Sequence, residues 1–85
     1  MRSIIFQNDA FKEFLGWALA DKKKYTRLGK LITETCRDPF EGIGKPEPLK
    51  GLLQGYWSRR IDEENRLIYK VDEQSITIIS CLGHY

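Results

Sequence analysis

The sequence predicts an α+β fold in which two helices pack on one face of a mostly antiparallel, twisted sheet. Apolar residues recur at helical spacing between residues 9 and 37, whereas residues 56–82 form short strand-like runs separated by turn residues. The predicted order of elements is therefore β-α-α-β-β-β. With 85 residues, the chain is expected to form a single domain that spans residues 1–85.

The N-terminal half is predicted to contain one strand and a helical hairpin. The segment of residues 2–6 is short and contains two β-branched isoleucines, which is typical of a strand. Asn8 or Asp9 offers an N-cap for the first helix. The expected buried face of that helix consists of Phe11, Leu15, Ala18 and Leu19, widened by Phe14 and Trp17. After a short polar break at residues 21–24, the second helix is expected to bury Tyr25, Leu28, Leu31, Ile32 and Thr35.

The C-terminal half is predicted to form three strands after an irregular loop. Pro39 ends the second helix, and the Gly- and Pro-rich residues 39–55 favour a loop with at most one helical turn near residues 49–53. The predicted strands span residues 56–61, 66–71 and 75–82, with turns at 62–65 and 72–74. Because the helices cover one face of the sheet, the opposite face is free to bind a ligand.

The composition excludes several classes of protein. The longest apolar runs are far shorter than the ~20 residues of a membrane span and too short for a signal peptide, so a cytoplasmic protein without membrane contact is expected. Cys36 and Cys81 lack metal-ligand spacing, so neither a metal nor a cofactor is expected. The net charge of only +2 argues against strong DNA binding by the chain alone, and the basic residues 22–30 read most simply as a solvated helix face.

Three residues on different predicted elements have the chemistry needed to cleave RNA without a metal. RNA supplies its own nucleophile, the 2′-hydroxyl, so an enzyme needs a base, a cation for the phosphorane and an acid for the departing 5′ oxygen. Glu47 can be the base, since Pro46 and Pro48 on either side stiffen the backbone that presents it. The plainer reading of Glu47 is an exposed loop carboxylate.

Arg66 can supply the cation. It begins a strand in which Leu67 and Tyr69 are expected to face the helices, so alternation places Arg66 on the open face. Either Arg59 or Arg60 should join it there, and the choice depends on the number of residues in the hairpin loop, which the sequence does not decide. The plainer reading of Arg66 is a strand arginine that pairs with a glutamate of the preceding turn.

His84 is the only histidine of the chain, and it can be the acid because the ordinary pKa of histidine lies near neutrality. The plainer reading is a solvated tail residue, but the preceding residues 76–82 look buried, which predicts an anchored C-terminal segment. Tyr85 can stack on a base, and Lys45 and Lys50 can hold phosphates as point charges.

These motifs together resemble the YoeB branch of the RelE/ParE toxin superfamily, and the resemblance extends over nearly the whole chain. The matching segments are residues 39–42, 44–50, 56–61, 63–64, 66–69 and 84–85. The resemblance implies a bacterial type II toxin that cuts mRNA in the ribosomal A site. The roles that it implies are Glu47 as general base, His84 as general acid, Arg66 as transition-state cation, Tyr85 in substrate positioning, and Lys50 and Arg60 in phosphate contact.

The resemblance also implies partners. Family members are neutralised by an antitoxin of the YefM type, are often homodimers, and contact DNA only in complex with the antitoxin. This chain departs from the family at Asn65, where other members often have histidine.

The leading prediction is therefore a ribosome-dependent endoribonuclease toxin that leaves a 2′,3′-cyclic or 3′ phosphate and a 5′ hydroxyl, with activity that survives EDTA. The alternative is a non-catalytic ParE-like toxin that acts by binding a protein target. Such a binding protein would not need Glu47 and His84 together.

Overall fold

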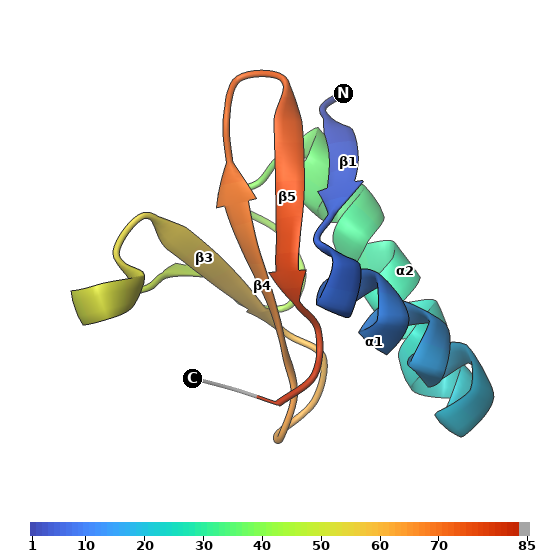
Figure 1. Cartoon of the computed structure of the whole chain (residues 1–85). Helices are drawn as coiled ribbons and strands as arrows, with labels where there is room; N and C mark the ends of the chain where they lie inside the picture. The colour runs from blue at the N-terminus through green and yellow to red at the C-terminus, as the bar shows by residue number, and fades with distance from the viewer. Residues whose placement is uncertain (84–85) are drawn as a thin grey trace.

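In the computed structural model, which describes residues 1–83, two helices lie along one face of a five-stranded sheet (Figure 1). The helices are α1 (Asn8–Ala20) and α2 (Lys22–Arg37). The strands are β1 (Ser3–Phe6), β2 (Glu47–Pro48), β3 (Tyr56–Arg60), β4 (Arg66–Val71) and β5 (Ser75–Ser80). The predicted fold class and order of elements are confirmed, with the two-residue β2 as an addition. A 3-10 turn, η1 (Gly51–Leu53), occupies the place of the predicted helical turn.

The strand order in the sheet is β1-β5-β4-β3-β2. β1 runs parallel to β5, while the other neighbouring pairs are antiparallel, so the sheet is mostly antiparallel as predicted. A register shift between Ile68 and Tyr69 interrupts the pairing of β4 with β5. The order leaves β2 at one edge of the sheet and β1 at the other.

One residue, Asp21, joins the two helices. Its backbone N–H donates to the carbonyl of Trp17 and ends α1, while its carboxylate accepts from the N–H of Lys24 and caps α2. The predicted helical hairpin is thereby confirmed. The predicted N-cap of α1 is wrong by one or two residues, because the helix begins at Asn8 and its N-cap is Gln7, which makes no side-chain capping bond.

The core lies between the helices and the sheet. The predicted face of α2 is confirmed, with Leu28, Leu31, Ile32 and Thr35 buried and Tyr25 packed against them. The predicted face of α1 is wrong for Phe11, Leu15 and Leu19, whose side chains are exposed. The prediction is confirmed for Phe14 and Trp17, which pack in or against the core together with Ala10, which was not predicted. The indole N–H of Trp17 donates to the carbonyl of Cys81 at 2.8 Å.

Within residues 1–83, neither helix combines the length and the apolar character that crossing a bilayer requires.

Candidate active site

The register between β3 and β4 decides which arginine accompanies Arg66. Arg60 lies directly opposite Arg66, and residues that are paired across antiparallel strands project to the same face. The next pair, Arg59 and Leu67, projects to the helix-covered face, where Leu67 belongs to the core. Arg60 and Arg66 therefore share the face of the sheet that the helices leave open, and the side chain of Arg60 is exposed there.

Arg59 is consequently removed from the candidate substrate-binding residues. It is 0% exposed, and its guanidinium donates to the carbonyls of Asp38, Glu41 and Ile43 and to the hydroxyl of Tyr69. Burial raises the pKa of Tyr69, although Arg59 opposes the increase, and the neutral hydroxyl donates to the carbonyl of Pro39. Arg59 and Tyr69 thus fix the loop between α2 and β2.

Glu47 reaches the same open face through β2. It pairs with Ser58 of β3, and Ser58 pairs with Ile68 of β4. From Glu47 to Arg66 there are two strand spacings across the sheet and a two-residue offset along it, which places their Cα atoms roughly 12 Å apart. Arg60 lies between them, diagonal to Glu47 and opposite Arg66. These side chains are long enough to reach a phosphate above Ser58. We call Glu47, Ser58, Arg60, Arg66 and Ile68 the open-face site.

Two lysines stand at the rim of this site. Lys45 precedes Glu47 by two residues and adopts a positive φ of 51°, which is uncommon for a residue other than glycine. Lys50 follows Glu47 by three residues, at the N-terminal end of η1. Both side chains are exposed, as their predicted contact with phosphate groups requires.

The chain after β5 returns to the start of β4. The N–H of Arg66 donates to the carbonyl of Gly83 at 2.8 Å, so the last described residue lies beside the arginine of the open-face site. His84 and Tyr85 lie outside the described residues, and their predicted roles remain predictions. The expected anchoring of the preceding segment is observed at Cys81, which is fully buried.

One contact at this place was not indicated by the sequence. The side-chain oxygen of Asn65 accepts a hydrogen bond from the N–H of Gly83 at 2.8 Å. Asn65 belongs to the turn between β3 and β4, whereas Gly83 follows β5. Only the Asp-x-x-Asn pattern of residues 62–65, typical of a turn held by side chains, gives a sequence signal here.

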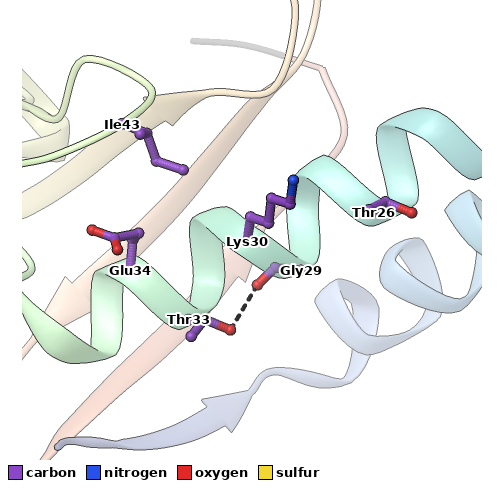
Figure 2. Close-up of a pocket in the computed structure, with 6 residues that line it drawn as sticks. All are labelled: Thr26, Gly29, Lys30, Thr33, Glu34 and Ile43. Atoms are coloured by element: carbon purple, nitrogen blue, oxygen red, sulfur yellow. Dashed lines mark hydrogen bonds between the residues drawn. The ribbon is translucent and has the colours of Figure 1, made fainter.

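A hollow of about 530 Å³ lies elsewhere on the molecule, beside α2. Figure 2 shows its lining residues, among them Lys30, Glu34 and Ile43, and the hydrogen bond from Thr33 to the carbonyl of Gly29. None of the predicted site residues lines it. Within residues 1–83, no three His, Cys, Asp or Glu side chains are grouped as metal ligands would be.

Bacterial toxins are among the solved structures that share this architecture. A chain of the Staphylococcus aureus YoeB dimer has a TM-score of 0.90 and 44% identity, covering 99% of this chain and 98% of that one. A chain of the YoeB–YefM complex from the same species has a TM-score of 0.89 and 42% identity, covering 100% and 99%. The two-helix layer, the strand order and the open face therefore define a toxin of the bacterial toxin–antitoxin class.

The family follows from the sequence itself. The family model described as YoeB-like toxin of bacterial type II toxin–antitoxin system matches residues 6–85, and the chain belongs to that family. Toxin RelK of Mycobacterium tuberculosis is 53% identical over 85 residues, which is the full length of both chains.

Proposed function

We propose that this toxin is a ribosome-dependent endoribonuclease that cleaves mRNA in the ribosomal A site and thereby arrests translation in the cytoplasm. The observation that best supports the proposal is the meeting of Glu47, Arg60 and Arg66 on the open face, next to the end of the described chain at Gly83. One carboxylate and two guanidinium groups surround Ser58 and Ile68, which are themselves buried, and such a small group of charges suits a single phosphodiester better than a duplex.

The proposed reaction needs no group beyond the chain and its substrate. Glu47 takes the proton of the 2′-hydroxyl, and the 2′ oxygen forms a bond to phosphorus. Arg66, assisted by Arg60, stabilises the charge of the phosphorane. The bond from phosphorus to the 5′ oxygen breaks, and His84 gives its proton to that oxygen. The products are a 2′,3′-cyclic phosphate, which can open to a 3′ phosphate, and a 5′ hydroxyl.

Substrate positioning is assigned to groups around this centre. Lys45 and Lys50 hold flanking phosphates by charge, and Tyr85 stacks on a base of the codon. Groups spread over three strands favour activity on mRNA that the ribosome holds in a fixed conformation, and weak activity on free RNA.

The test is cleavage of mRNA on programmed ribosomes by the wild type, Glu47→Gln and His84→Gln. Both variants should lose at least about a hundredfold in rate, the usual contribution of a general acid or base. Glu73→Gln, an exposed residue of the turn between β4 and β5, is the matched control and should cleave like the wild type. An mRNA with a 2′-deoxy nucleotide at the scissile position should stay intact.

The end groups of the products test which nucleophile attacks phosphorus, and they are informative although ribosomes need Mg²⁺ and the assay cannot contain a chelator. A cyclic or 3′ phosphate supports the 2′-hydroxyl mechanism, while a 5′ phosphate with a 3′ hydroxyl contradicts it. Intact mRNA despite growth arrest in cells would favour a toxin that binds a protein target.

A YefM-type antitoxin and a second copy of the chain are the proposed protein partners. The support is that similar solved toxins are described as a YoeB dimer and a YoeB–YefM complex. Contact with DNA is assigned to the toxin–antitoxin complex. Co-purification with the antitoxin, and the mass of the free toxin in solution, test these assignments.

A further inference from the structure

The segment after β5 is held by α1 at a single residue. Cys81 is fully buried, its carbonyl accepts from the indole N–H of Trp17 at 2.8 Å, and its N–H donates to the carboxylate of Glu13 at 2.8 Å. Both backbone polar groups of Cys81 are therefore bound to side chains of α1. This contact fixes where the segment starts, two residues before Gly83.

The segment is held a second time at Gly83, by the start of β4. The carbonyl of Gly83 accepts from the N–H of Arg66, and its N–H donates to the side-chain oxygen of Asn65, each at 2.8 Å. Gly83 has a φ of +77°, a conformation that glycine adopts readily and other residues rarely. Asn65, the last residue of the turn, and Arg66, the first residue of β4, thus bind both backbone groups of Gly83.

The orientation of the Asn65 side chain is determined by Asp62. The amide nitrogen of Asn65 lies 3.1 and 3.2 Å from the two carboxylate oxygens of Asp62. Burial would raise the pKa of Asp62, but hydrogen bonds from Lys24, Glu64 and Asn65 lower it to about 2, so the carboxylate is ionised at neutral pH and only accepts. The amide nitrogen of Asn65 must therefore face Asp62, and its oxygen must face Gly83.

Asp62 is in turn connected to the helical layer. Its carboxylate lies 2.7 Å from the ammonium of Lys24 in the first turn of α2. The line of contacts Lys24–Asp62–Asn65–Gly83 therefore joins α2 to the C-terminal segment through the turn between β3 and β4.

We infer that Asn65 is a positioning residue of the proposed active site: it holds Gly83, the residue that precedes the proposed general acid His84, beside Arg66. One trans peptide spans only about 3.8 Å between Cα atoms, so a displacement of Gly83 passes to His84 almost undiminished. Asn65 itself does not touch the reacting atoms. The inference depends on the proposed function, because it assigns a role in presenting the general acid.

The first test compares Asn65→Ala with the wild type on programmed ribosomes. Loss of the anchor should lower kcat by about tenfold to a hundredfold, as misplacement of a catalytic group by about 1 Å does, while KM stays within about twofold. Glu63→Ala, an exposed residue of the same turn, is the control and should match the wild type. An unchanged kcat in Asn65→Ala would overturn the inference.

Two further variants separate positioning from general damage to the fold. In a His84→Gln background, Asn65→Ala should cause no additional loss of rate, because there is no acid left to position. In the exchanged pair, Asp62→Asn with Asn65→Asp, the new amide at position 62 can donate to the new carboxylate at position 65. That carboxylate can also accept from the N–H of Gly83, so the double variant should recover most of the lost kcat. An equal loss in both backgrounds would mean that Asn65 acts on the fold and not through His84.

A measurement without RNA keeps the inference distinct from the proposed function. Amide hydrogen exchange at Gly83 should accelerate at least about tenfold in Asn65→Ala while exchange in β4 stays unchanged. Unaltered exchange at Gly83 would overturn the anchor even if the toxin cleaves mRNA. If exchange accelerates but the wild type cleaves no mRNA, the anchor stands, the proposed function fails, and the assignment to His84 fails with it.

Discussion

Arg59 is the largest side chain that the described residues bury completely. A buried cation is stable only when its donors are satisfied, and this guanidinium donates to three loop carbonyls and a tyrosine hydroxyl. The loop that it binds leads directly into β2 and Glu47. Arg59 therefore supports the open-face site from the opposite side of the sheet.

Replacing Arg59 with methionine should lower the free energy of unfolding by about 3 kcal/mol, because the buried Tyr69 hydroxyl and the loop carbonyls of Asp38, Glu41 and Ile43 would lose their shared donor. Arg60→Met is the matched control, since its side chain is exposed, and it should change that free energy by less than about 0.5 kcal/mol. Chemical denaturation followed by circular dichroism measures both.

The variants Arg59→Met and Arg60→Met also separate support of the fold from contact with the substrate when their activity is measured. Arg60→Met should reduce mRNA cleavage while it leaves the fold intact. Equal stability of the two variants would contradict the assignment of Arg59 to the loop.

The neighbouring arginines also illustrate what a sequence can predict at the scale of one residue. Alternation along a strand correctly indicated that Arg59 and Arg60 face opposite ways. The choice between them required the register with β4, which the turn at residues 62–65 fixes through hydrogen bonds to Asp62. Glu47 and Arg66 were predicted from their chemistry and spacing, and Arg60 from the family resemblance, but their common face depends on pairing between strands.

Among the elements, the turn between β3 and β4 depends most on a single charge. The Asp62 carboxylate binds the N–H groups of Glu64 and Asn65, the amide of Asn65 and the ammonium of Lys24. Because the folded-state pKa of about 2 lies below the ordinary value of 3.8, ionisation of Asp62 favours the folded state above that ordinary value.

Stability should therefore be lost as the pH falls from about 4 towards 2, where Asp62 takes up a proton in the folded state. We expect Asp62→Asn to be less stable than the wild type by up to about 2 kcal/mol at pH 6, and the difference to shrink towards zero near pH 2. Asparagine keeps one oxygen acceptor for the N–H groups of Glu64 and Asn65, but it loses the charge and the second acceptor that faces Lys24 and the Asn65 amide. Denaturation across that pH range measures the difference, and a gap that does not depend on pH would contradict the prediction.

Helix α1 shows where prediction at this scale fails. Its sequence contains two overlapping apolar stripes at helical spacing, Phe11-Leu15-Leu19 and Ala10-Phe14-Trp17. Hydrophobicity favours the first stripe, but the sheet packs against the second, where the indole of Trp17 finds a hydrogen-bond acceptor at Cys81. That acceptor lies about sixty residues further along the chain, so the local pattern, which included Phe14 and Trp17 in the predicted face, could not decide between the two stripes.

At the scale of the whole molecule, both cysteines belong to the core that joins the helices to the sheet. Cys36 and Cys81 are free and buried, and burial raises the pKa of both thiols, that of Cys81 to about 12. The reactive thiolate is therefore scarce at pH 8 in the folded protein.

A thiol reagent such as DTNB should accordingly label the native protein slowly at pH 8. In concentrated guanidinium chloride it should label two thiols per chain at once, and this denatured sample is the internal control. Rapid labelling of one native thiol would show that the core around it opens easily.

The predicted fold agrees with the structure because helical spacing, turn residues and short strands each have local causes. Two features of the sheet have no local cause. β2 consists of two residues whose pairing depends on β3, and the parallel pairing of β1 with β5 joins residues about seventy positions apart. Both lie at edges of the sheet, where the partner strand determines whether a segment pairs at all.

The parallel pair has a consequence for how the chain acquires its shape during synthesis. Ser3 to Phe6 have their hydrogen-bond partners in residues 75–78, so β1 cannot dock until the last strand has been made. Contacts of such large sequence separation form late and slowly. A nascent chain can form its helical hairpin early, but its sheet closes only after residues 75–78 have left the ribosome that makes it.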